Sequence, residues 1–237
     1  MKNPSRFVVV TGGTGALGTP VTQAYIKQGC QVAIPYISQH KIEPFEQRIG
    51  GLKTQVTLIR ADVTVADEVQ DFFRTVFEKF GQIDILVNIA GGFIGGISVA
   101  ETDAEKWEFM MDLNLKSTFL CCKAVLPHMI ERQYGKIVNV SSRAGLNGVA
   151  GLSAYCVSKG GVRTLTESIA EEVKDRGVNV NAVMPSIIDT PVNRAAMPDE
   201  DHSRWVPPGE IAKVIRFLTS DDATIINGAS IPVYGRA

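Results

Sequence analysis

The stretch FVVVTGGTGALG, residues 7–18, decides how the rest of the sequence is interpreted. Its β-branched run predicts a buried strand, and the following residues, 18–29, have the spacing of a helix that closes on Gly29. A glycine-rich loop that follows a strand and opens a helix is the context that a dinucleotide-binding loop requires. Gly12, Gly15 and Gly18 would permit the tight turn, the approach of the backbone to a pyrophosphate, and close packing of helix on strand. The helix N-terminus would then offer free N–H groups and a partial positive charge to phosphate.

The remaining apolar segments alternate in character along the chain. Further helices are predicted at 65–81, 103–132, 152–176 and 208–219, and further strands at 31–36, 54–63, 84–92, 136–142, 178–185 and 231–233. Strands that are apolar throughout and alternate with helices indicate a parallel sheet covered on both faces. Right-handed crossovers then give an α/β, Rossmann-like doubly wound fold of about seven strands, with its ligand at the carboxyl ends of the strands. Without an internal linker or repeat, one domain over residues 1–237 is expected.

Composition excludes several classes of protein. The formal net charge of −1 argues against a strong general attraction to nucleic acid or anionic membranes. No apolar stretch has the length of a membrane span, and the N-terminal residues read as a strand, so no signal peptide or membrane partner is expected. The four cysteines have neither metal-ligand spacing nor a disulfide pattern. They predict buried, reduced thiols in a cytoplasmic protein without a metal site.

The segment SAYCVSK, residues 153–159, carries the candidate chemistry. Tyr155 and Lys159 are four residues apart, so on a helix both side chains lie on one face. A phenol with a pKa near ~10 is a poor acid–base catalyst at neutral pH, and a nearby cation favours its ionised form. Ser142 stands at the predicted carboxyl end of a strand, where its hydroxyl can polarise a carbonyl oxygen.

These motifs occur in the order that is typical of the short-chain dehydrogenase/reductase family, which the chain resembles over almost its whole length. The marks are TGGTGALG at 11–18, Asp62, NIAGG at 88–92, Asn114, Ser142, Tyr155 with Lys159, and Pro185 followed by Thr190. The chain is similar to the single-domain members, such as the 3-oxoacyl-carrier-protein reductases. The resemblance implies hydride transfer between a nicotinamide coenzyme and a carbonyl or secondary alcohol, with Tyr155 as general acid and base.

The resemblance also implies a set of coenzyme contacts. Lys159 would bind the nicotinamide ribose, and Asn114 would help to hold a water in a proton relay. Asp62 and Val63 would contact adenine, while Ile188 and Thr190 would lie near the carboxamide. The implied coenzyme set comprises Gly12, Thr14, Gly15, Ala16, Leu17, Gly18, Tyr36, Ser38, Asp62, Val63, Asn88, Ala90, Gly91, Tyr155, Lys159, Pro185, Ile188 and Thr190.

Three positions depart from the family pattern. Ala16 replaces a glycine of the phosphate loop, Ile89 replaces an asparagine, and Ser186 replaces the glycine that commonly follows the proline. None of these departures removes a catalytic group, but they leave the subfamily open.

The choice of coenzyme depends on the end of the second predicted strand. An acidic residue there normally binds the ribose hydroxyls of NAD and repels the phosphate of NADP. Tyr36 holds this place, and Ser38, His40 and Lys41 follow it, so the sequence favours NADP(H) over NAD(H). No arginine follows Tyr36.

The substrate remains open at this level. The loop at 187–205 is the expected substrate loop, and its acidic run at 197–202 is expected to be a solvated surface. A small carbonyl or alcohol substrate is expected, with a sugar, polyol or steroid-like alcohol as the alternative. A coenzyme-binding regulator without turnover is the competing class of function. The resemblance further implies a homo-oligomer, a dimer or tetramer, paired through the helices predicted at 103–132 and 152–176.

Overall fold

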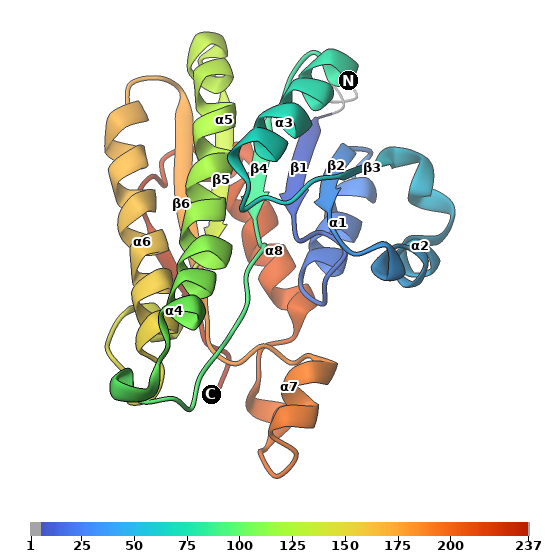
Figure 1. Cartoon of the computed structure of the whole chain (residues 1–237). Coiled ribbons are helices and arrows are strands. Elements are labelled where there is room, and N and C mark those ends of the chain that lie inside the picture. The colour runs from blue at the N-terminus through green and yellow to red at the C-terminus, as the bar shows by residue number, and fades with distance from the viewer. Residues whose placement is uncertain (1–5, 237) are drawn as a thin grey trace.

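A computed structural model describes residues 6–236, which form one seven-stranded sheet in which every pair of neighbouring strands is parallel (Figure 1). The strand order is β3-β2-β1-β4-β5-β6-β7. The strands are β1 (Phe7–Thr11), β2 (Gln31–Tyr36), β3 (Val56–Arg60), β4 (Ile85–Asn88), β5 (Gly135–Val140), β6 (Val178–Pro185) and β7 (Ser230–Val233). This is the predicted doubly wound α/β fold. Residues 1–5 and 237 of the predicted domain lie outside the described part.

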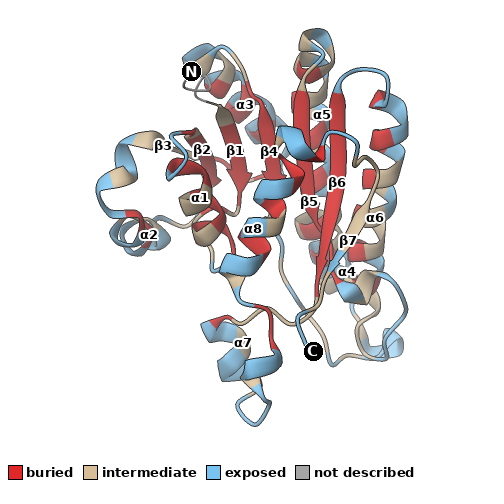
Figure 2. Ribbon diagram, turned by 180° about the vertical axis from the view of Figure 1, so that it is seen from behind, coloured by how far each residue is buried: buried red, intermediate tan, exposed pale blue. Residues whose placement is uncertain are grey.

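Helices cover both faces of the sheet. One face carries α1 (Gly18–Ile26), α2 (Ile42–Ile49) and α8 (Pro208–Leu218), and the other carries α3 (Ala66–Phe80), α5 (Ser117–Arg132) and α6 (Ser153–Val173). Two short helices, α4 (Ala104–Met110) and α7 (Pro191–Ala196), lie toward the carboxyl edge of the sheet (Figure 1). Each face has its own apolar core, and β5 and β6 are buried along their whole length, as Figure 2 shows. Burial on both faces explains why these strands lack an alternating polar pattern.

The structure differs from the sequence prediction in the helices. Two helices, α2 and α7, lie in segments where the sequence predicts none. The single helix predicted at 103–132 is divided into α4, a π-helical turn at Met111–Lys116, and α5. A π turn inserts a residue into the helical repeat, and such insertions are frequent at functional sites.

Three predicted strands are longer than the observed ones, among them the strand predicted at 136–142, which ends at Val140. The strand predicted at 84–92 ends at Asn88, and the strand predicted at 54–63 ends at Arg60. After Asn88 the backbone leaves the ladder because the Thr11 hydroxyl oxygen accepts hydrogen bonds from the N–H groups of Ile89 (3.0 Å) and Ala90 (3.1 Å). A side chain therefore ends the strand and binds the tips of β1 and β4 together.

The four cysteines are buried and unpaired, as the sequence predicts. Burial raises the pKa of Cys122 to about 12, which keeps this thiol protonated at neutral pH.

Within residues 6–236, no helix has the length and apolar character needed to cross a bilayer. The cytoplasmic location stays a prediction.

A buried polar chain connects the sheet with helix α6. Asn88 Nδ2 donates to Asn139 Oδ1 (2.9 Å), and Asn139 Nδ2 donates to Thr166 Oγ1 (2.9 Å). Asn139 and Thr166 are fully shielded from solvent, and Asn88 is nearly so. Because a buried donor without a partner costs more than a hydrogen bond contributes, this chain fixes α6 against β4 and β5.

We expect Thr166→Val to reduce the free energy of unfolding by about 1–3 kcal/mol, because Asn139 Nδ2 would be left buried without an acceptor. Ser168→Ala is the matched control, since both hydroxyls donate to the carbonyl four residues earlier but Ser168 is exposed. We expect the control to stay within about 0.5 kcal/mol of the wild type. Urea denaturation measures both, and equal effects would contradict the role of the polar chain.

Candidate functional site

The loop between β1 and α1 can be built only with glycine at two of its positions. Gly12 has a positive φ of +65°, and a Cβ there would lie 2.9 Å from Ala90 N. A Cβ on Gly18 would lie 2.0 Å from the carbonyl oxygen of Gly12. Both obstructing atoms belong to the backbone and cannot move aside. The helix therefore starts in direct contact with the loop, and the space above the loop is free of side chains from these positions.

The start of α1 fits a phosphate group. Its N-cap residue, Leu17, makes no side-chain capping bond, so the first N–H groups of the helix are not occupied by a side chain. The Leu17 side chain is buried in the core, and only its backbone can face the loop. Gly15 N donates to Gly12 O (3.0 Å), which closes the turn, while Thr14 is half-buried and Ala16 is exposed. This bare cradle at a helix N-terminus fits the pyrophosphate of the expected dinucleotide.

Ser142 and Tyr155 are brought together as the sequence predicts. Ser142 follows β5 and Tyr155 lies in the first turn of α6, thirteen residues later. The Ser142 hydroxyl approaches the Tyr155 phenol closely enough to act on its pKa. Burial raises the pKa of Tyr155, and the Ser142 hydroxyl lowers it in part. The phenol is therefore protonated in this state of the protein.

Lys159 is the most perturbed charged group of the site. Its side chain is 5% exposed, and burial lowers its pKa to about 8. Its Nζ donates to Val140 O (2.9 Å), at the end of β5. A Cβ added to Gly91 would lie 3.2 Å from this Nζ and 2.7 Å from Asn114 Oδ1. Lys159 and Asn114 therefore flank the same backbone segment after β4.

Asn114 holds that segment in place from the π-helical turn. Its Oδ1 accepts from Gly92 N (3.0 Å), and its Nδ2 donates to Gly92 O (3.2 Å) and to Ser158 Oγ (3.1 Å). Asn114 is fully buried. The side chain thus connects the segment after β4 with helix α6.

Sequence reasoning missed two serines that position the site. Ser158 accepts from Asn114 and donates to Tyr155 O (2.9 Å). Ser141 Oγ donates to Lys159 O (2.7 Å) and so attaches α6 to the end of β5. Their position beside Ser142 and Lys159 was the available signal, but adjacency in sequence does not show where a hydroxyl points.

An aromatic ring stands beside the catalytic candidates. Phe93 packs edge-on against Tyr155, with 5.0 Å between the ring centroids, and remains 62% exposed. A Cβ on Gly95 would lie 2.6 Å from the Phe93 ring and 2.3 Å from Leu152, so these two side chains can pack as they do only with glycine at position 95. The approach to Tyr155 is therefore apolar on this side.

The predicted adenine-side residues lie at the ends of β2 and β3. Tyr36 is the last residue of β2 and Ser38 precedes a 3₁₀ turn, and both are half-buried. Asp62 Oδ1 accepts from Thr64 N (2.9 Å) and Thr64 Oγ1 (2.7 Å), while Val63 is buried in the core. The Asp62 carboxylate thus shapes the turn after β3 through one of its oxygens.

The predicted nicotinamide-side residues follow β6, which ends at Pro185. Ile188 pairs with Val206 in an isolated bridge, so the segment between them closes into a loop that contains α7. Thr190 Oγ1 accepts from Asn193 N (3.2 Å) and caps α7. The predicted acidic run is exposed from Pro198 to Asp201.

Comparison with known proteins identifies a matching family, similar sequences and a similar solved structure. The model of a family described as short chain dehydrogenase matches residues 6–201. The 3-oxoacyl-[acyl-carrier-protein] reductase FabG of Thermotoga maritima is 32% identical over 99% of this chain and 98% of its own. The 2-(R)-hydroxypropyl-CoM dehydrogenase of Xanthobacter autotrophicus is 35% identical over 98% of both chains. A solved structure titled "ElxO with NADP Bound" superposes with a TM-score of 0.93 at 28% identity and covers 98% of both chains.

The buried Lys159 should make stability depend on pH. Its pKa is about 8 in the folded protein and near 10.4 in an unfolded chain, so the unfolded state binds more protons between these values. We expect the stability of the wild type, relative to Lys159→Met, to rise by roughly 2–4 kcal/mol from below pH 8 to pH 10.5.

Urea denaturation of both proteins at several pH values measures this difference, in which titrations shared by the two proteins cancel. Parallel curves for wild type and variant would show that the burial of Lys159 does not lower its pKa.

Proposed function

Because this chain belongs to the short-chain dehydrogenase family, whose members interconvert carbonyls and alcohols, we propose that it reduces a ketone to a secondary alcohol with Tyr155 as general acid. The observation that carries the proposal is the convergence of Ser142, Tyr155 and Lys159 beside a loop that fits a dinucleotide. When bound, the nicotinamide coenzyme supplies the hydride, and the protein supplies placement and proton transfer.

Tyr155 gives its proton to the substrate oxygen. Burial keeps the Tyr155 phenol protonated before the reaction, as a proton donor requires. The Ser142 hydroxyl hydrogen-bonds the substrate oxygen and stabilises the negative charge that develops on it. Lys159 is cationic at neutral pH because its lowered pKa of about 8 still lies above 7. Its charge favours the phenolate that remains after transfer, so the tyrosine can release its proton.

Asn114 acts as a positioning residue in this proposal. Its side chain bonds are made to Gly92 and Ser158, so it holds the segment after β4 against the catalytic helix. Its backbone carbonyl accepts from Thr118 Oγ1 (2.9 Å) and has a second lone pair for the water expected in the proton relay.

We propose NADP(H) as the preferred coenzyme. An acidic residue at the end of β2 would repel a 2′-phosphate, and Tyr36 occupies that place. Similar structures carry titles with NADP or NADPH, among them ElxO and an actinorhodin polyketide ketoreductase variant. These support the preference.

The substrate class proposed is a small ketone with an apolar substituent, of the kind found in 3-oxoacyl groups. The exposed Phe93 ring beside Tyr155 supports an apolar contact next to the reacting carbonyl. The related proteins include reductases of 3-oxoacyl and acetoacetyl thioesters as well as a butanediol dehydrogenase. A polyol dehydrogenase working in the oxidative direction is the alternative that the same substrate panel tests.

A homo-oligomer is proposed through α4, α5 and α6. Large apolar side chains are exposed on these helices: Trp107 (38%), Phe109 (52%), Phe119 (44%) and Val157 (50%). Cys122 and Val125 of α5 are fully buried and take no part in this surface. Exposed apolar surface of this kind is typical of protein–protein contacts. Light scattering at micromolar concentration should give a dimer or tetramer, and a monomer would contradict the proposal.

We expect Tyr155→Phe to lower kcat by a factor of about 10²–10⁴ while coenzyme binding is retained, because only the transferable proton is removed. Tyr134→Phe is the control, because Tyr134 directly precedes β5, away from the carboxyl edge, and its hydroxyl donates to Asp221 (3.2 Å). NADPH consumption with ketones, β-keto esters and diketones measures turnover, and coenzyme fluorescence measures binding.

Unchanged turnover in Tyr155→Phe would refute the acid role. Tight coenzyme binding by the wild type, without turnover of any ketone or alcohol in the panel, would favour the regulatory function.

A further inference from the structure

No arginine follows Tyr36 in the sequence. A cation at that position could bind the 2′-phosphate of NADP. Ile37 occupies that position and is 53% exposed. The structure supplies a cation from the neighbouring strand. In the parallel ladder between β2 and β3, Tyr36 is in register with Arg60, the last residue of β3.

We propose that Arg60 binds the 2′-phosphate of the coenzyme and makes the protein selective for NADP(H). The proposal rests on the coenzyme preference proposed above and assigns it to one side chain. In-register neighbours of a parallel pair project to the same side of the sheet. The pairs Val32–Val56 and Ile34–Leu58 pack in the core beneath α1 and α2, so by alternation Tyr36 and Arg60 lie on that same side.

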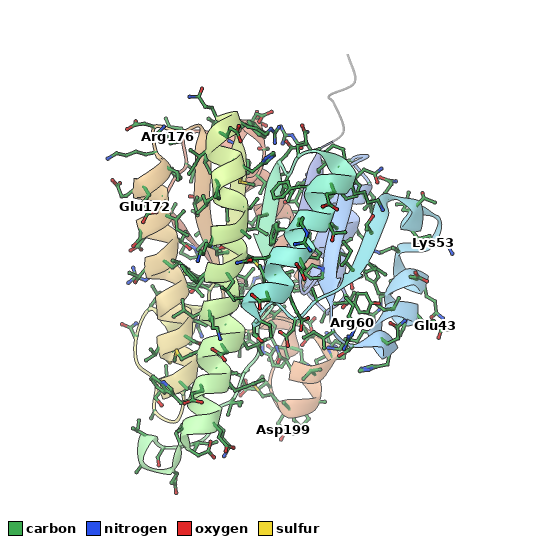
Figure 3. The ribbon with its side chains drawn as sticks, turned by 45° about the horizontal axis from the view of Figure 1, so that its top comes forward. Glu43, Lys53, Arg60, Glu172, Arg176 and Asp199 are labelled. Atoms are coloured by element: carbon green, nitrogen blue, oxygen red, sulfur yellow. The ribbon has the colours of Figure 1, made fainter. Side chains whose placement is uncertain are left out.

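The position suits a phosphate on the adenosine ribose. That ribose binds at the carboxyl end of β2 in dinucleotide folds of this type. Neighbouring strands lie about 4.8 Å apart, a span shorter than an extended arginine side chain. Arg60 is exposed at the tip of β3 (Figure 3), and within residues 6–236 its guanidinium has no hydrogen bond or ion pair with the protein.

The charged side chains that flank the ends of β2 and β3 have both signs. His40 and Lys41, both exposed, lie in the turn that connects β2 with α2. The carboxylates of Asp62, Glu68 and Glu43 oppose an anion, but each of them makes a contact other than with Arg60. Asp62 Oδ1 accepts from Thr64, and Glu68 Oε2 accepts from Asp62 N (2.7 Å). Glu43, in the first turn of α2, accepts a hydrogen bond from Gln47 (3.4 Å).

An arginine suits this role better than a lysine would. Its planar guanidinium can donate two parallel hydrogen bonds to a phosphate group, and it remains charged at every accessible pH. The contrasting interpretation is a solvated cation that protects an edge strand from pairing with another chain. The two interpretations differ in what removal of the charge does to binding of phosphorylated and unphosphorylated coenzyme.

The test is a calorimetric titration of the full chain, without substrate, with NADPH and NADH. For Arg60→Gln we expect NADPH to bind about 10- to 100-fold more weakly, the loss typical of a hydrogen bond to a charged group, and NADH to change less than about twofold. Arg60→Lys should lie between the two. Titration with 2′,5′-ADP and 5′-AMP should reproduce the difference, which places the effect at the 2′-phosphate.

Lys53→Gln is the matched control. Lys53 is also exposed, and it precedes β3, whereas Arg60 is the last residue of β3 (Figure 3). The control therefore removes a cation near the other end of the same strand. We expect its affinities for both coenzymes to equal those of the wild type. Circular dichroism of each variant confirms that it is folded.

Three results would overturn the proposal. If the wild type prefers NADPH and Arg60→Gln keeps that preference, the assignment to Arg60 is wrong while the proposed coenzyme stands. If both coenzymes weaken equally, Arg60 acts on the structure of the edge strand. If the wild type prefers NADH, the coenzyme preference itself is wrong, and the role of Arg60 is refuted with it.

Discussion

The parallel arrangement of all seven strands is the constraint on which the functional site depends. Parallel strands put all their carboxyl ends at one edge of the sheet, and the chain leaves each strand there through a loop. The glycine-rich loop follows β1, the segment with Gly91 follows β4, and Ser142 follows β5. Residues separated by more than a hundred positions in the chain therefore converge without any long excursion. The apolar strands that require helices on both faces are also the reason that α1 and α6 present their first turns to this edge.

The chemistry of the site comes from burial. Lys159 and Asn114 lie in a region almost without solvent, and the Tyr155 phenol is largely shielded. Burial favours the neutral form of both Tyr155 and Lys159, which keeps the first protonated and brings the pKa of the second close to neutrality. A buried amine opposes folding, and the two apolar cores offset that cost. Hydrogen bonds from Ser141, Ser158 and Asn114 hold the groups in position, so the site is preorganised before any ligand binds.

Local patterns predicted the type of most elements but not all of their limits. The helix α2 is eight residues long and contains Pro44, so by itself it is a weak helix, and Phe45 and Ile49 stabilise it by packing in the core. The helix α7 is six residues long and is capped by Thr190, a hydroxyl that the sequence assigns to the coenzyme. The π turn before α5 escapes prediction because apolar spacings of three and four persist across it. Asn114 lies within this turn, and its contact with Gly92 is made across the fold.

The sequence by itself determined the fold class, and it predicted the dinucleotide loop and the Ser142, Tyr155 and Lys159 set, because each depends on spacing within one element or on the order of elements. Glycines next to a strand, a Tyr-x-x-x-Lys helix and alternating apolar segments are local features that a chain carries before it folds. Only the tertiary structure decided the burial that shifts the pKa values, the hydrogen bonds that connect α6 to β4 and β5, and the register that places Arg60 beside Tyr36. Register and burial depend on how entire faces of helices and strands pack, and that packing joins residues whose distance in sequence carries no information about contact.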